Sequence, residues 1–181
     1  MKIAILGYSG SGKSTLGRAL GEFYGVPVLH LDTVMFLPNW QERQKDEQLA
    51  IVQRFMDENE SWVIDGNYGN LLRARRLEEA DVIVLMLFNR FSSLVRVTRR
   101  YLRYRGHRRP DMAEGCSEKL DAEFIRWVLW KGRTKGRCKH LRDILTQYPG
   151  KCVVIKNQRQ INRYLQETHN TGKEQTHAGS L

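Results

Sequence analysis

The chain has 181 residues, of which 41% are hydrophobic and 28% are charged, and its formal net charge at pH 7 is +10. This length predicts a single domain that buries its own core without metals or disulfides. The positive charge favours an anionic partner, such as a nucleotide, a nucleic acid or an acidic surface. Three cysteines without paired spacing argue against a disulfide framework and are typical of a reducing cytoplasm.

No membrane partner is expected from the apolar segments. The first apolar stretch is too short for a signal peptide, and the longest run, 82–88, is too short to cross a bilayer.

Five apolar runs have the continuous hydrophobicity of strands that are buried on both faces. They lie at 3–6, 26–31, 62–64, 82–88 and 152–155. Helical periodicity separates several of them, for example at 14–23 and 42–59. Strands that alternate with helices predict an α/β fold with a parallel sheet.

A long insertion, from about residue 91 to 148, separates the fourth and fifth strands. It begins with a basic stretch, and helices are expected from near residue 119 and over 141–148. The polar segment 169–181 is predicted to be a disordered tail, so a single domain is expected over 1–168.

The segment 7–15, GYSGSGKST, matches the P-loop pattern G-x-x-x-x-G-K-[ST] between a predicted strand and a predicted helix. Its glycines let the backbone N–H groups surround an anion, and the helix directs its positive end at the same point. The alternative is a glycine-rich turn without a ligand. We expect ATP to bind this loop, with Lys13 at the β- and γ-phosphates and the Ser14 hydroxyl at Mg²⁺. The expected ATP-binding residues are Gly7, Ser9, Gly10, Ser11, Gly12, Lys13, Ser14 and Thr15.

Two carboxylates follow predicted strands, at the sheet edge where ligands bind in open α/β folds. Asp32 follows the second strand and is expected to accept a proton from an attacking hydroxyl or to hold magnesium through water; the alternative is a helix cap. Asp65 ends the third strand and is expected to orient magnesium-bound water; the alternative is an Asp-Gly turn.

The basic stretch 90–109 contains eight arginines and no acidic residue. Arginines can clamp phosphates during phosphoryl transfer, contact a nucleic-acid backbone, or form a solvated helix face. We expect two or three to serve the active site. Trp127 and Trp130 are expected in the core, and Trp40 is a candidate for stacking on the acceptor.

The P-loop, Asp32, the segment DGNY at 65–68 and the arginine-rich insertion together resemble the adenylate-kinase-like P-loop kinases. More narrowly, the segments WVIDGNY at 62–68 and RRPDMAEGC at 108–116 resemble the bacterial DNA topology modulation proteins. The resemblance implies a five-stranded parallel sheet and a lid over about 99–137. It also implies that arginines at the two ends of the lid meet the phosphates during catalysis. These are Arg99, Arg103, Arg133 and Arg137.

The sequence departs from true adenylate kinases after Asp65-Gly66, where Asn67 to Asn70 replace the arginine that grips the acceptor monophosphate in that family. This departure argues against AMP as the acceptor, and Asp32 resembles the acceptor aspartate of nucleoside-type kinases. The sequence therefore predicts a Mg-ATP-dependent kinase that acts on a small, nucleoside- or nucleotide-like acceptor. The alternative is a nucleic-acid-associated NTPase or a regulator of DNA topology.

Overall fold

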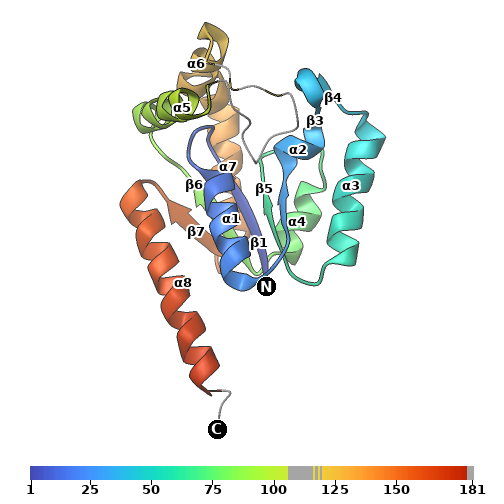
Figure 1. Ribbon diagram of the computed structural model, residues 1–181, viewed down its shortest axis with the longest axis vertical. Coiled ribbons are helices and arrows are strands. Elements are labelled where there is room, and N and C mark those ends of the chain that lie inside the picture. The colour runs from blue at the N-terminus through green and yellow to red at the C-terminus, as the bar shows by residue number, and fades with distance from the viewer. Residues whose placement is uncertain (106–115, 117, 119, 179–181) are drawn as a thin grey trace.

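The computed structural model describes residues 1–105, 116, 118 and 120–178 of the chain (Figure 1). Most of the segment RRPDMAEGC at 108–116, and part of the expected lid, lie outside the described residues.

The core of the fold is a parallel sheet of five strands, as the sequence predicts. The strands lie side by side in the order β2-β5-β1-β6-β7, and every pair is parallel. This order places the P-loop strand β1 at the centre. The strands are β1 (Lys2–Gly7), β2 (Val28–His30), β5 (Trp62–Asp65), β6 (Val82–Met86) and β7 (Cys152–Ile155).

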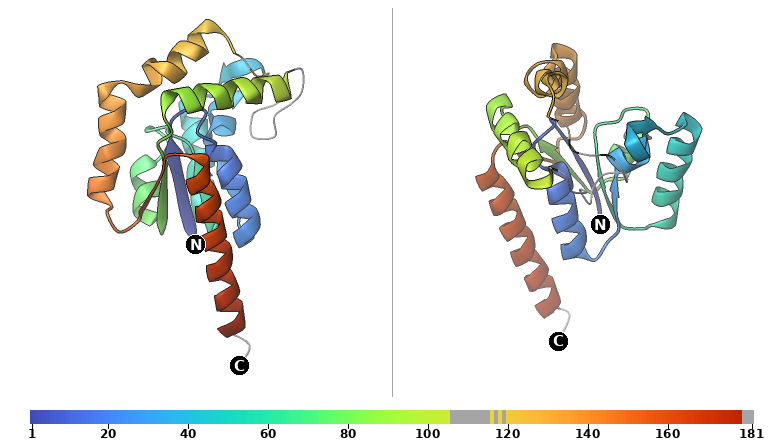
Figure 2. Two further views of the ribbon diagram at one scale, coloured as in Figure 1. Left: turned by 90° about the vertical axis from the view of Figure 1, so that its left-hand side faces the viewer. Right: turned by 45° about the horizontal axis from the view of Figure 1, so that its top comes forward.

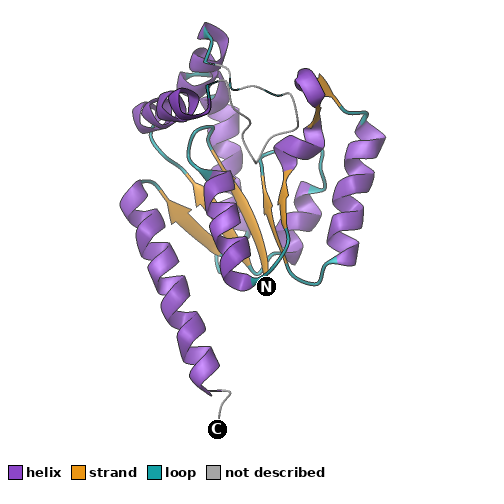
Figure 3. Cartoon of the chain, viewed as in Figure 1, coloured by secondary structure: helices purple, strands orange, loops and turns teal. Residues whose placement is uncertain are grey.

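Helices cover both faces of the sheet, so its strands are apolar on both sides (Figure 3). In β1, Ile3 and Ile5 pack with residues of α1 (Lys13–Tyr24) and α8 (Gln158–Ala178). Ala4 and Leu6 face the opposite layer, which α3 (Lys45–Glu58), α4 (Arg73–Glu79) and α7 (Lys135–Gln147) form. The alternation of side chains along a strand thus divides the core into two clusters.

The second strand is shorter than predicted. It covers three residues because the chain enters helix α2 (Leu31–Met35) directly after His30. The sequence did not predict the small hairpin that follows, β3 (Phe36–Leu37) and β4 (Gln41–Glu42), joined by the 3₁₀ turn Pro38–Trp40. Asp32 consequently lies in the first turn of a helix.

Two helices of the insertion cross above the carboxyl ends of the strands (Figure 1). They are α5 (Arg90–Tyr104) and α6 (Ala122–Leu129), and the 3₁₀ turn Lys131–Arg133 connects α6 to α7. The packed face of α5 lies directly on the P-loop, because Gly10 is next to Ser93 and Val97.

Helix α8 continues through most of the segment that the sequence predicts to be disordered. It lies along α1 and extends past the lower edge of the sheet (Figure 2). Its first turns are anchored by Ile161, Tyr164 and Leu165 in the core.

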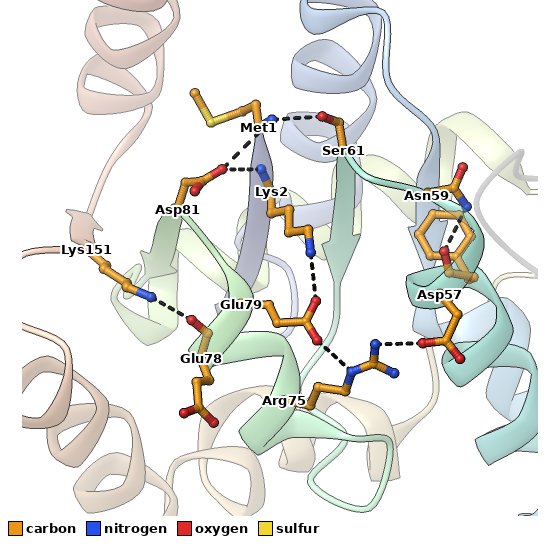
Figure 4. A network of polar contacts seen from close by, with 11 residues as sticks. Met1, Lys2, Asp57, Asn59, Ser61, Arg75, Glu78, Glu79, Asp81 and Lys151 are labelled. Carbon is orange, nitrogen blue, oxygen red and sulfur yellow. Dashed lines mark hydrogen bonds and ion pairs between the residues drawn. The ribbon is translucent and has the colours of Figure 1, made fainter.

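The sheet edge opposite the P-loop is held by ion pairs (Figure 4). Glu79 of α4 accepts from Lys2 Nζ at 2.8 Å and from Arg75 Nε at 2.6 Å, and Arg75 also binds Asp57 at 2.6 Å. This network connects α4 to β1 and α3. The loops of the candidate site lie at the opposite ends of the strands. None of the helices within the described ranges is both long and apolar enough to cross a membrane.

Candidate active site

The P-loop lies between β1 and α1, and its glycines adopt backbone conformations that other residues avoid. Gly10 and Gly12 have φ values of 77° and 95°, in the left-handed region. A side chain at Gly10 would also place its Cβ 2.6 Å from Val97 Cγ2. Gly12 is the N-cap of α1, and Lys13 is its first residue. The positive end of α1 therefore points into the loop, as in phosphate sites at helix N-termini.

The polar side chains of the loop fit a bound triphosphate. Lys13 Nζ donates to the carbonyl oxygens of Gly7 at 3.2 Å and Tyr8 at 3.3 Å, so the ammonium group spans the loop. Ser11 is fully buried, and its hydroxyl has no hydrogen-bond partner within the described part of the chain. Buried polar groups normally have a partner, so a ligand would complete this arrangement.

The side-chain amide of Asn67 holds the start of the P-loop. Its Oδ1 accepts from the Gly7 N–H at 2.9 Å, and its Nδ2 donates to the Gly7 carbonyl at 2.6 Å. Because Asn67 follows β5, this double contact fixes the P-loop against the neighbouring strand end. The sequence marked Asn67 as part of the DGNY segment and as a replacement for an arginine, but it did not indicate this contact with Gly7.

Asp65 is buried at the end of β5, next to the end of β2. Its Oδ1 lies 2.8 Å from His30 Nδ1, and the register of the two strands places these residues opposite each other. Gly66 follows with φ 138°, and a Cβ there would lie 2.8 Å from the Leu31 side chain. Asp65 is thus a buried carboxylate at the last residue of β5, and the turn assigned nearest to it lies at Gly69 and Asn70.

Asp32 accepts a hydrogen bond from the phenol of Tyr68. The distance between Asp32 Oδ1 and the Tyr68 oxygen is 2.7 Å. The N-cap of α2 is His30, so the alternative interpretation of Asp32 as a helix cap is wrong. Burial of Tyr68, followed by the negative charge of Asp32, raises the pKa of the phenol, which therefore remains a donor at neutral pH.

A buried arginine supports the loop that carries Asn67 and Tyr68. Arg76 is 0% exposed and donates to the carbonyls of Leu71 at 2.8 Å and Tyr68 at 2.7 Å. Burial, followed by nearby Arg73, lowers the pKa of Arg76 to about 10, against an opposing effect of Asp65. The guanidinium is still charged at neutral pH. Arg76 was not among the residues predicted for the site, because the sequence did not predict α4.

Arg133 joins the insertion to the P-loop. Its Nη1 donates to the Phe88 carbonyl at 2.7 Å, and its Nη2 donates to Ser93 Oγ at 2.8 Å. Its guanidinium also lies 3.9 Å from the centre of the Tyr8 ring. These contacts connect the end of β6, α5 and the P-loop. Burial lowers the pKa of Arg133 from its ordinary value.

Arg137 reaches the same region through a tryptophan. Its guanidinium lies 4.6 Å from the centre of the Trp127 ring, and Trp127 Nε1 donates to Ser9 Oγ of the P-loop at 3.2 Å. Trp127 was predicted to belong to the core. It instead positions an arginine beside the P-loop, a role that only the folded arrangement of α6 and α7 reveals.

The structure does not bring Arg99 and Arg103 to the P-loop. Both side chains are exposed on the outer face of α5. Arg96, one turn earlier, takes the position beside the loop, where its Nε donates to the Gly10 carbonyl at 3.1 Å. Its Nη1 donates to Gln158 of α8 at 2.6 Å. The helical period explains the difference, because Arg96 is adjacent to the packed residues Ser93 and Val97.

Within the described residues, no group of three or more His, Cys, Asp or Glu side chains forms a ready-made metal cage. Mg²⁺ commonly binds through one or two protein ligands together with substrate phosphates and water. The Ser14 hydroxyl in the first turn of α1 and the Asp65 carboxylate at the end of β5 are oxygen ligands of the kind that such a site uses.

Comparison with family models and with curated proteins gave no match for this chain. Solved structures do match over nearly the whole length. A kinase described as putative, from Chloroflexus aurantiacus, aligns with a TM-score of 0.51 at 13% identity, over 93% of this chain and 97% of that one. A deoxyadenosine kinase from M. mycoides, solved with dCMP and a flexible dCDP, gives 0.50 at 13% identity, over 94% and 100%.

At this level of identity the similarity concerns the fold. The chain has a P-loop NTPase fold of the kinase-like kind, with a five-stranded parallel sheet between helices.

Proposed function

We propose that this protein is a Mg-ATP-dependent phosphotransferase that acts on a small-molecule acceptor. The observation that carries the proposal is the arrangement of Lys13, Asp32 and Asp65. The lysine begins α1 behind the P-loop, and the two carboxylates follow adjacent strands at the same sheet edge. A phosphate site beside two acidic groups is what phosphoryl transfer to a hydroxyl needs.

The P-loop residues would hold the ATP phosphates. The backbone from Gly7 to Thr15 supplies N–H donors, and Lys13 supplies a cation that releases its two carbonyl contacts when a phosphate takes their place. Mg²⁺, held by Ser14 and through water by Asp65, would neutralise charge on the phosphates. The bond from His30 holds the Asp65 carboxylate in one orientation.

Asp32 would receive the proton of the acceptor hydroxyl. The Tyr68 phenol already donates to Oδ1, which fixes the orientation of the carboxylate. General-base assistance of this kind typically contributes about a hundredfold to ten-thousandfold in rate.

The insertion would act as a lid that excludes water and brings cations to the phosphates. Arg133 and Arg137 lie beside the P-loop through Tyr8 and Trp127, and Arg96 contacts the Gly10 carbonyl directly. Arg99 and Arg103 would need α5 to turn about its axis before either reached a phosphate.

A direct test combines the wild-type protein and Lys13→Ala with Mg-ATP and a panel of nucleosides, nucleotides and small alcohols. We expect transfer to at least one acceptor by the wild type and a loss of several kcal/mol of transition-state stabilisation, roughly a thousandfold or more in rate, in the variant. Near-normal transfer by Lys13→Ala would contradict the mechanism. No transfer to any acceptor, with ATP binding intact, would contradict the proposed function.

The sequence motifs at 62–68 and 108–116 favour a finer assignment to the bacterial DNA topology modulation proteins. That name describes a cellular effect and leaves the reaction open. The three cysteines are free thiols, which supports a cytoplasmic location.

A nucleic-acid-associated ATPase is the second candidate, and the outer face of α5 favours it. Arg99 and Arg103 are exposed there, next to the exposed side chains of Phe91 and Leu102. Any basic protein binds DNA at low salt, so affinity alone is a weak test. The second candidate predicts that DNA stimulates ATP hydrolysis at physiological salt, and a lack of stimulation would rule it out.

A further inference from the structure

A cavity of about 260 Å³ opens between the P-loop, α4 and α7. We call it the basic pocket. Its polar lining comes from Tyr8, Asn67, Arg73, Arg137 and His140. Asn67 also binds Gly7, so the pocket is next to the start of the P-loop.

The basic pocket has two arginines and no acidic residue in its lining. Neither Arg73 nor Arg137 forms an ion pair with a carboxylate in the part of the chain that the structure describes. Arg75, two residues along α4 from Arg73, is paired with both Asp57 and Glu79. The positive charge of Arg75 is thus neutralised by two carboxylates. The charges of Arg73 and Arg137, which line the same cavity, are not neutralised by any described carboxylate. Two guanidinium groups in a partly enclosed space are a site for an anion.

His140 gives the second, independent observation. Its Nε2 atom is buried and has no hydrogen-bond partner among the described residues. Burial, followed by nearby Arg73, lowers the pKa of the imidazole, with an opposing effect of Asp143. The ring is therefore neutral near pH 7 and can offer one N–H donor. Buried polar atoms are normally paired, so this atom lacks the partner that a bound ligand would provide.

Arg137 is held in place by its neighbours. The Trp127 ring under its guanidinium is itself bonded to Ser9 of the P-loop. An anion bound by Arg137 would therefore sit at a fixed position relative to the phosphates on the P-loop. Positioning of this kind accounts for much of the catalysis in phosphoryl transfer.

We propose that the basic pocket binds the acidic group of the phosphoryl acceptor, so that the acceptor is a phosphate monoester or a carboxylate rather than a neutral alcohol or nucleoside. This inference deepens the proposed function and rests on it. The cavity is smaller than a typical pocket for a drug-sized ligand, about 300 to 1,000 Å³. It therefore suits a small acidic metabolite or the acidic end of a larger one.

The test uses calorimetric titration of the full chain after saturation with Mg²⁺ and a non-hydrolysable ATP analogue, so that the P-loop itself is filled. Three probes share a three-carbon frame: glycerol, D-glycerate and glycerol 3-phosphate. We expect at least one acidic probe to bind about tenfold to a hundredfold more tightly than glycerol, as for a charged hydrogen bond. The acid that binds, carboxylate or phosphate, identifies the class of the acceptor.

Arg73→Gln and Arg137→Gln should each abolish this preference, and Arg75→Gln is the matched control that should keep it. Equal affinity for glycerol and both acids would overturn the inference, as would a preference that survives both pocket variants. The acidic probes are also titrated into the protein without the analogue. Acid binding to the free protein that disappears once the analogue is bound would assign the pocket to the nucleotide and would also overturn the inference. Binding of the ATP analogue, which is measured before the probes are added, tests the proposed function separately. A failure to bind the analogue contradicts the proposed function, independently of the affinities of the three probes.

Discussion

Asn67 holds Gly7 with both atoms of its amide, at 2.9 Å and 2.6 Å. One side chain after β5 thus fixes both backbone groups of the first P-loop glycine, at the end of β1. The same residue lines the basic pocket. The nucleotide site and the proposed acceptor site therefore share a wall.

We predict that Asn67→Asp weakens binding of the ATP analogue by roughly tenfold to a hundredfold. The aspartate carboxylate cannot donate to the Gly7 carbonyl, so a carboxylate oxygen faces the carbonyl oxygen and the two repel each other. The loss of this hydrogen bond costs about 1–3 kcal/mol. The aspartate also places a negative charge beside the phosphates. Asn70→Asp introduces the same charge at an exposed position nearby and should change the affinity little. If the two variants weaken analogue binding equally, the added negative charge alone lowers the affinity, and the contact between Asn67 and Gly7 does not contribute to it.

Asp65→Asn should raise the Mg²⁺ concentration that half-maximal activity requires. The amide keeps the size of the side chain but loses the charge that orients metal-bound water, and the contact with His30 at 2.8 Å becomes an uncharged one. Asp57→Asn, at the exposed far edge of α3, is the control. An unchanged magnesium requirement would leave Asp65 with a purely structural role at the end of β5.

Asp32→Asn should slow transfer by about a hundredfold or more while the affinity for ATP stays nearly constant, because the proton acceptor is lost and the P-loop is untouched. Tyr68→Phe should have a smaller effect in the same direction, since it removes only the bond that orients Asp32. Transfer rates, ATP affinity and melting temperature are measured for both variants. A normal transfer rate in Asp32→Asn would remove this residue from the site.

Arg76→Met should lower the free energy of unfolding by roughly 2–4 kcal/mol, because it leaves the buried carbonyls of Leu71 and Tyr68 without donors. Arg75→Met breaks only partly exposed ion pairs on the same helix and should lower it by about 1 kcal/mol or less. Urea unfolding measures both values. A similar, small decrease in the free energy of unfolding in both variants would show that Arg76 does not stabilise the loop after β5.

The sequence predicted the parts of the molecule that depend on local patterns. Continuous apolar runs predicted the five strands, and the spacing of glycines with Lys13 predicted a P-loop between a strand and a helix. The prediction of β2 was too long because Leu31 is apolar both as a strand residue and as the buried first residue of α2. Apolar character alone does not distinguish these states.

Contacts between distant elements were not predictable in this way. Trp127 and Arg76 bind groups supplied by the P-loop and by the loop after β5, and neither contact has a local signal. The arginine stretch predicted that cations would reach the site, but the choice of Arg96 over Arg99 depends on which face of α5 packs on Gly10. That face is set by tertiary packing.

The last prediction concerns stability at mildly acidic pH. Burial, followed by Arg73, lowers the pKa of His140 below its ordinary value of 6.5 in the folded protein. Below about pH 6.5 the unfolded chain therefore binds a proton that folded His140 resists, and protonation favours unfolding. The contribution of this residue to stability is fully present above pH 6.5 and is lost as the pH falls through the lowered value.

His140→Gln should thus flatten the dependence of the unfolding free energy on pH between about 7 and 5, relative to the wild type. The slope is the quantity compared, because the substitution also changes packing at every pH. His169→Gln removes an exposed histidine on α8 and serves as the control. Urea unfolding at several pH values gives the three slopes. If the slope of His140→Gln equals that of the wild type, the imidazole is not held neutral by its surroundings, and the donor that we assign to the basic pocket would have to come from another group.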